Sequence, residues 1–239
     1  MIDILDVRMS FGSLHVLRGV SLRVAEGESV ALCGTNGAGK STLMQCITGV
    51  HSFRGSIRVG GFDVRTDGKR ARRLLGYVPQ ELAFRDDMRV SEAVRFYAAL
   101  RGLRSTDVRA VLRPVLLEEH AQARVRALSG GMKQRLALAI ALLGDPPMLL
   151  LDELSSSLDI EGRESFLRLL MELRGEGRTL VFASHRKEEV AMLADRAMWI
   201  VDGALHACAA DGSVCVPAPC FACVKSIKEI DDVAMPTTA

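Results

Sequence analysis

The stretch GTNGAGKST, residues 34–42, constrains the fold more than any other part of the chain. It matches the pattern G-x-x-x-x-G-K-[ST] at every position, between a strand-like run, ESVALCG, and a helix-like run, KSTLMQCITGV. Glycines let the backbone amides of residues 36–41 turn inward, and a helix N-terminus adds about half a positive charge. A chance glycine turn would not explain the complete pattern in this setting, so we expect a nucleotide-phosphate loop.

Each position of the loop has a predicted role. We expect Lys40 to place its charge on the β and γ phosphates, and Ser41 to offer its hydroxyl to Mg²⁺. Thr42 is expected to reach a neighbouring phosphate. The predicted nucleotide contacts in this loop are Gly34, Asn36, Gly37, Ala38, Gly39, Lys40, Ser41 and Thr42.

The alternation of short apolar runs with helical patterns predicts an α/β fold with a mainly parallel sheet. Between Tyr77 and Met148 two helical patterns follow each other, which predicts a helical subdomain over about 82–145 inserted in the sheet domain. RAMWIVDGALHACA reads as two strands joined at Asp202-Gly203. We therefore expect one domain over residues 1–207 and a partly irregular tail over 208–239.

Composition narrows the class of protein further. The 239 residues are 49% hydrophobic and 25% charged, which is typical of a folded chain, and a formal net charge of +2 does not favour a nucleic-acid partner. The N-terminus lacks the pattern of an export signal, and no apolar run approaches the length of a membrane span. We expect a cytoplasmic protein without a direct membrane span.

Two acidic residues end the buried, strand-like run MLLLDE. In an open α/β sheet, ligands gather outside the carboxyl ends of the strands, so this pair should face the phosphate loop. Neighbouring strand residues point in opposite directions, which favours Asp152 as the Mg²⁺ ligand and Glu153 as the general base. His185 follows another such run, TLVFAS, and should lie at the same edge. In isolation, a solvated acidic pair and a structural histidine would be the ordinary interpretations.

Taken in order, these elements and three others form a set. Gln80 in GYVPQE, LSGGM at 128–132 and SSLD ending at Asp159 accompany the phosphate loop, LLLDE and SHR. With this set the chain resembles the ATP-binding subunit of ATP-binding-cassette (ABC) transporters, most of all the ABC-2-type exporter branch. The resemblance implies a P-loop NTPase of ABC ATPase type with an antiparallel N-terminal β part beside the parallel core.

The resemblance also implies that two subunits pair head to tail. The signature of one subunit then closes over the γ-phosphate bound by the other, and its residues here are Ser129, Gly130, Gly131 and Met132. Gln80 would join the metal ligands and link metal and water to the helical lobe. Asp159 would signal across the dimer, and His185 would hold the γ-phosphate in the catalytic set with Glu153 and Gln80.

Phe11 would stack on adenine, although an aromatic residue that ends an alternating strand is often part of the core. Two positions depart from the family pattern. Met132 stands where glutamine is commoner, and Leu154 replaces the proline that usually follows the catalytic glutamate. Loss of that proline frees the backbone after Glu153, and we expect looser catalytic geometry and slower hydrolysis.

The resemblance predicts a subunit that binds ATP and Mg²⁺, hydrolyses ATP and powers an exporter by closing on separate transmembrane subunits. Its partners would be a second copy of itself or a related ATPase subunit, and a permease, at the cytoplasmic face of the membrane. A soluble ABC-type ATPase of cofactor or metal-centre assembly stays open. The tail cysteines Cys208, Cys215, Cys220 and Cys223 contain one C-x-x-C pair that could bind a soft metal ion, or they are idle thiols.

Overall fold

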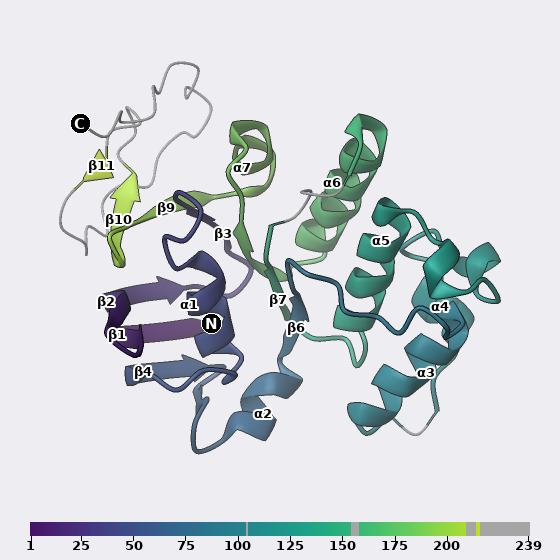
Figure 1. The fold of residues 1–239 in the computed structure, drawn as a ribbon, viewed down its shortest axis with the longest axis horizontal. Helices are drawn as coiled ribbons and strands as arrows, with labels where there is room; N and C mark the ends of the chain where they lie inside the picture. Colours follow the sequence, from purple (N-terminus) through teal and green to yellow (C-terminus); the bar gives the residue numbers. More distant parts are fainter. Residues whose placement is uncertain (104, 154–157, 209–213, 216–239) are drawn as a thin grey trace.

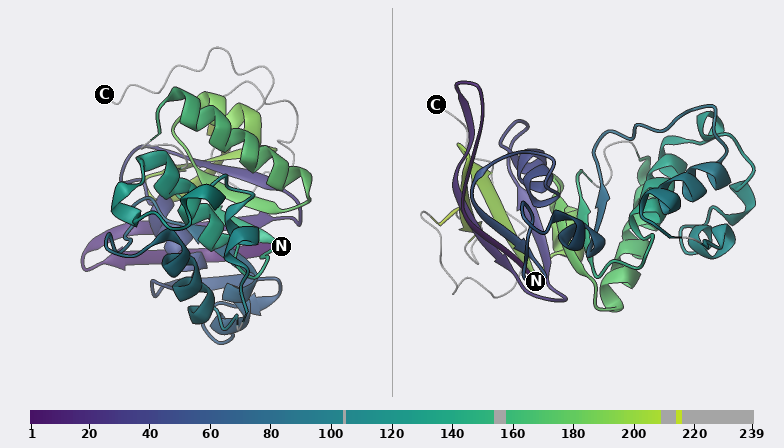
Figure 2. Two further views of the ribbon diagram at one scale, coloured as in Figure 1. Left: turned by 90° about the vertical axis from the view of Figure 1, so that its right-hand side faces the viewer. Right: turned by 90° about the horizontal axis from the view of Figure 1, so that it is seen from below.

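The computed structural model describes residues 1–103, 105–153, 158–208 and 214–215. Within them, an antiparallel sheet and a mainly parallel sheet lie at one side of the molecule and a group of helices at the other (Figure 1). The right-hand view in Figure 2, seen from below, shows the same separation along the longest axis. The predicted α/β class is confirmed.

The antiparallel sheet has the strand order β2-β1-β4-β5. Its strands are β1 (Ile2–Phe11), β2 (Leu14–Val24), β4 (Arg54–Val59) and β5 (Phe62–Asp63). Ile2 lies opposite Val24 on one side and Val59 on the other, and all three side chains are fully buried. This sheet is the antiparallel N-terminal part that the resemblance implied.

The second sheet has the order β11-β10-β9-β3-β8-β7-β6. Its parallel strands are β3 (Ser29–Cys33), β6 (Leu75–Val78), β7 (Met148–Leu151), β8 (Thr179–Ala183) and β9 (Arg196–Val201). β10 (Ala204–Cys208) returns antiparallel to β9, and β11 (Val214–Cys215) pairs with β10. The predicted turn at Asp202-Gly203 is confirmed, and both residues have positive φ, 48° and 75°.

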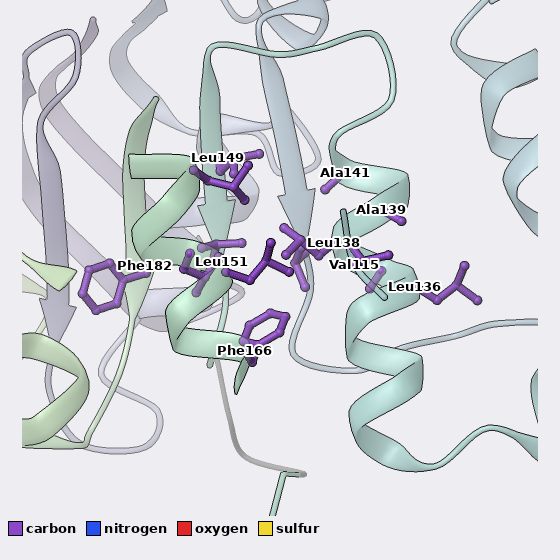
Figure 3. Packing of buried hydrophobic residues seen from close by; sticks show 14 of the residues in the cluster. Val115, Leu136, Leu138, Ala139, Ala141, Leu149, Leu151, Phe166 and Phe182 are labelled. Atoms are coloured by element: carbon purple, nitrogen blue, oxygen red, sulfur yellow. The ribbon is translucent and has the colours of Figure 1, made fainter. Parts of the chain in front are cut away.

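The parallel strands are buried on both faces, which explains their continuous apolar runs. In β7, Leu149 and Leu151 belong to the core on the side of the helical lobe, whereas Met148 and Leu150 belong to the core shared with the antiparallel sheet. Figure 3 shows the first of these cores, with Phe166 and Leu138 reaching from two helices toward β7. The period of two along each strand therefore builds two cores from one sheet.

In the described part of the chain, the sheets are covered by α1 (Lys40–Ile47), α2 (Gly68–Arg73), α6 (Ile160–Gly175) and α7 (Lys187–Leu193). α1 packs between the two sheets, because its buried residues share a core with residues of β1 and β3. α6 and α7 contribute to the opposite core. The helix that begins at the phosphate loop therefore packs against both sheets.

Between β6 and β7 the described chain is helical. It contains α3 (Val90–Leu100), α4 (Val108–Leu112), short 3-10 turns at Glu118–His120 and Val125–Ala127, and α5 (Gly130–Ala141). The second expected helix, over STDVRAVLRPVLLEEH, is shorter than its sequence pattern, because Pro114 lacks the N–H that continues a helix. The Arg101 guanidinium donates to the carbonyls of Leu75 and Leu143 at 2.7 and 2.6 Å and ties this lobe to the sheet.

Candidate functional site

Four neighbouring strands end at one edge of the parallel sheet, and each is followed by a predicted site residue. Their spatial order is β3, β8, β7, β6. The phosphate loop follows β3, His185 follows β8 by one residue, Asp152 follows β7 directly, and Gln80 follows β6 by one residue. Because the strands are parallel, their carboxyl ends meet at this edge. Residues more than 100 positions apart are brought together in this way.

The phosphate loop depends on glycine at two positions. Gly34 and Gly39 have φ of 141° and 108°, which L side chains rarely adopt. A Cβ at Gly34 would lie 2.7 Å from the Ile200 carbonyl oxygen, and one at Gly39 would lie 3.0 Å from Leu17. The loop therefore packs against β2 and β9 too closely for side chains at these positions.

Lys40 is 5% exposed, and its ammonium group donates to the carbonyl oxygens of Gly34 at 2.9 Å and Thr35 at 3.0 Å. These two bonds hold the charge inside the loop. An ammonium group has three donors, so it retains one for a phosphate oxygen. The arrangement suits the role predicted for Lys40.

The predicted metal ligands lie together. The Ser41 hydroxyl donates to Asp152 Oδ1 at 3.0 Å, and Asp152 is 2% exposed. Burial raises the pKa of the Asp152 carboxyl, and the nearby Glu153 charge raises it further, while the bond from Ser41 opposes the shift. A buried carboxylate with a neighbouring carboxylate gains from a cation, and the hydroxyl and carboxylate are the hard oxygen donors that Mg²⁺ prefers. These two residues therefore fit a Mg²⁺ ion.

Gln80 contacts the predicted base. Its side-chain amide, just beyond the end of β6, donates at 2.9 Å to Glu153 Oε2, just beyond the end of the neighbouring strand β7. Glu153 has a positive φ of 53°, which is uncommon for a residue other than glycine. A residue before proline is restricted to extended conformations, so the leucine that follows is compatible with this φ. Leu154 itself lies outside the described residues.

Two residues that the sequence analysis did not single out support His185, whose own side chain is exposed. The buried Ser184 hydroxyl donates to Glu189 Oε2 at 2.5 Å and accepts from the Arg186 backbone N–H at 3.0 Å. Glu189 is 1% exposed, and its other oxygen lies 3.8 Å from Arg186 Nε. These hydrogen bonds hold the two residues that flank His185, Ser184 and Arg186. No spacing rule points to Glu189, because only the fold reveals its burial.

The signature residues begin α5. Ser129 is its N-cap and accepts from the Met132 backbone N–H at 3.3 Å, so the glycines occupy the first turn. Figure 1 shows α5 on the far side of β6 and β7 from α1. Among the described residues, no hydrogen bond joins the signature to the phosphate loop. The Ser129 O–H donor is not used by the cap, and the helix N-terminus attracts anions.

Asp159 caps α6, where its side chain accepts from the Gly162 backbone N–H at 2.8 Å. A Cβ at residue 162 would lie 2.6 Å from the same carboxylate oxygen, so a side chain there would require the Asp159 carboxylate to shift. The cap gives Asp159 a structural role beside the predicted one. Its predicted signalling role concerns a second subunit and stays a prediction.

Phe11 is not a core residue. It ends β1 with half of its surface exposed, and its ring meets His51 edge to face, with centroids 5.2 Å apart and an interplanar angle of 87°. The core interpretation of Phe11 is therefore wrong, and half of its surface is open to contact with another group.

The predicted soft-metal site cannot be located on the described side chains. Cys220 and Cys223 lie outside the described residues, and Cys208 and Cys215 are described only by their backbone pairing in β10 and β11. The part of the chain with described side chains contains no cluster of three or more His, Cys, Asp or Glu suited to a metal.

Of the described helices, none combines the length and apolarity needed to cross a membrane.

Proteins of known role match this sequence. It is 32% identical over 90% of its length to the linearmycin resistance ATP-binding protein LnrL of Bacillus subtilis (strain 168), and the match covers 71% of that protein. It is 37% identical over 84% of its length to the Nod factor export ATP-binding protein I of Burkholderia lata, and the match covers 68% of that protein. The chain thus spans about two thirds of the length of these relatives.

Solved structures match as well. A dimeric ATP-binding cassette in a post-hydrolysis state, bound to ADP and Pi, superposes with a TM-score of 0.77 at 25% identity, covering 85% of this chain and 95% of the other. Residues 17–156 match the family model described as ABC transporter. Together with the shared edge of phosphate loop, acids and histidine, these matches show that the chain belongs to the ABC transporter family and is one of its ATP-binding, ATP-hydrolysing cassettes.

Proposed function

We propose that the chain powers an exporter: ATP closes two cassettes on separate transmembrane subunits, and hydrolysis reopens them. The observation that carries the proposal is the split between the two halves of the site. Lys40 and Asp152 lie at the sheet edge, while Ser129 begins a helix on the other side of β6 and β7. A second copy, arranged head to tail, supplies the missing half, as a dimeric relative of known structure supports.

In this mechanism Lys40 and the loop amides hold the phosphates, and Glu153 takes a proton from the attacking water. Mg²⁺, held by Ser41 and Asp152, would neutralise phosphate charge when bound, and Gln80 would join it from the lobe side. His185 would contact the γ-phosphate, and Asp159 would carry the state of one site to the other. Such a reaction relies on positioning and charge stabilisation and needs no covalent intermediate.

An aromatic surface on the helical lobe is the proposed permease dock. The Tyr97 ring meets Phe84 edge to face at 6.4 Å and Phe96 at 5.3 Å, which joins the segment after Gln80 to α3. Phe96 is 50% exposed and Leu100 is 68% exposed, so an apolar face is open beside the segment that carries Gln80. Movement of a transmembrane subunit bound to this surface would shift the segment that carries Gln80 and so change its contact with Glu153.

The exporter branch is favoured over an assembly ATPase because the relatives described above are named for export and for resistance. The cargo would be decided by the transmembrane subunits. By this proposal the cassette is peripheral, on the cytoplasmic face of the membrane.

The test is recovery of the partner from detergent-solubilised membranes with the tagged full chain, followed by mass spectrometry. We expect a multi-span protein at an abundance similar to that of the bait. The Phe96→Asp variant should lose it, whereas Met171→Asp, a change at another exposed apolar residue on α6, should retain it. Recovery of soluble partners alone would contradict the exporter and favour the assembly ATPase.

A further inference from the structure

A chain of contacts runs from Phe11 along α1 to the predicted metal carboxylate. The first contact joins Phe11 to His51, which lies just beyond α1. The Nε2 atom of His51 lies 2.9 Å from the side-chain oxygen of Gln45. An amide oxygen only accepts, so this ring nitrogen carries a hydrogen and donates. The same imidazole packs edge to face on Phe11, which places a fixed aromatic contact behind an exposed ring.

The chain continues on the other side of Gln45. The Gln45 side chain also lies close enough to Tyr77 on β6 to act on its phenol, whose pKa burial raises and Gln45 lowers, and the Tyr77 hydroxyl lies 3.4 Å from Asp152 Oδ2. In this contact the Tyr77 hydroxyl donates and the carboxylate oxygen of Asp152 accepts. Asp152 Oδ1 accepts from Ser41 at 3.0 Å. Both oxygens of the carboxylate are therefore oriented by neighbours.

The geometry at Phe11 suits presentation of a flat ligand. Phe11 ends a strand and is half exposed, so its ring would sample several orientations without a neighbour. An interplanar angle of 87° means that His51 contacts the ring in a T-shaped arrangement. Base stacking uses one ring face, and a T-shaped contact with a single neighbour occupies at most one face of the Phe11 ring.

We propose that His51 is a positioning residue of the nucleotide site: held by Gln45, it fixes the Phe11 ring so that a face is presented to the base of the nucleotide. Because Gln45 also contacts Tyr77, the base contact and the Asp152 carboxylate share one support along α1. The inference rests on the proposed nucleotide site and on the stacking role that the resemblance predicts for Phe11, and it assigns His51, Gln45 and Tyr77 a place in the same site.

The test compares ADP with inorganic pyrophosphate, which lacks the base, by calorimetry on the full chain. Phe11→Ala should weaken ADP about tenfold, and His51→Ala roughly two- to tenfold, with pyrophosphate affinity unchanged in both. The double variant should be no weaker than Phe11→Ala alone, since His51 acts through that ring. His51→Phe keeps an aromatic contact and should recover part of the ADP affinity. The control is Ser52→Ala, at the exposed next residue.

The outcomes separate the two proposals. If Phe11→Ala lowers ADP affinity and His51→Ala does not, stacking stands and the role of His51 is overturned. If His51→Ala weakens ADP and pyrophosphate equally, its effect is general and the positioning role is overturned as well. If Phe11→Ala leaves the preference for ADP unchanged, the stacking role fails and this inference fails with it.

Discussion

The Gln80 side-chain amide donates to the Glu153 carboxylate at 2.9 Å, and this bond joins the segment leading into the helical lobe to the predicted general base. A carboxylate oxygen bound to an amide is less available to a water molecule. Movement of the lobe that withdraws Gln80 would release that oxygen. If the proposed permease dock and general base are correct, this contact links docking directly to hydrolysis.

Glu153→Gln tests the general-base role. The amide cannot take a proton from water, so we expect the hydrolysis rate to fall by about 10²- to 10⁴-fold, while ATP binding persists. The ATP-bound dimer should then accumulate, and size-exclusion chromatography with ATP would detect it. Single-turnover hydrolysis measures the rate. A turnover rate equal to that of the wild type would refute the assignment.

Lys40→Met tests the phosphate loop. Nζ is held by two loop carbonyls and has one donor left for phosphate, so its removal should weaken ATP binding by at least about tenfold, the equivalent of one charge-assisted hydrogen bond of 1.5–3 kcal/mol. Lys69→Met is the matched control, because Lys69 is exposed on α2. Equal losses in the two variants, measured by calorimetry, would argue against a specific role for Lys40.

The support of His185 can be tested at Glu189. Glu189→Ala removes the acceptor of the Ser184 hydroxyl, so His185 should lose its fixed position, and we expect kcat to fall about tenfold with nucleotide affinity unchanged. Glu189→Gln retains an acceptor oxygen and should restore most of kcat. The neighbouring Glu188 is exposed, and Glu188→Ala is the control. A purely structural role would lower thermal stability without this split between kcat and affinity.

A pH effect is expected from Cys46, on the buried side of α1. Burial raises the pKa of its thiol from 9.0 to about 11. The folded state therefore binds this proton more tightly than the unfolded state, and the resulting stability is present below pH 9 and is lost as pH rises toward about 11. Relative to Cys46→Ala, the wild type should lose about 1 kcal/mol between pH 8 and 10. Urea unfolding measures the difference, and parallel curves would contradict it.

Most of the candidate site could be predicted, because its residues belong to local sequence patterns. The phosphate loop, the acidic pair after β7 and the histidine after β8 each follow a continuous apolar run, and a parallel sheet brings such positions to one edge. Glu189, Tyr77 and His51 were not predictable, since their roles depend on which distant side chains meet them. The length of α4, which ends before Pro114, was also not predicted. The apolar period continues in the sequence past the point where proline interrupts the backbone hydrogen bonds.

The last prediction concerns the proposed head-to-tail dimer. In such a dimer each site takes its phosphate loop from one chain and Ser129 from the other. Lys40→Met chains and Ser129→Arg chains should each be inactive alone. When they are co-expressed with different tags and purified by both tags, one site of each mixed dimer is intact, so about half of the wild-type hydrolysis per dimer should return. Mixed dimers of Lys40→Met with Lys40→Ala should stay inactive.

If phosphate loop and signature acted within one chain, every chain of the first mixture would carry a defect and no activity would return. Failure to recover any doubly tagged dimer would contradict a homodimer.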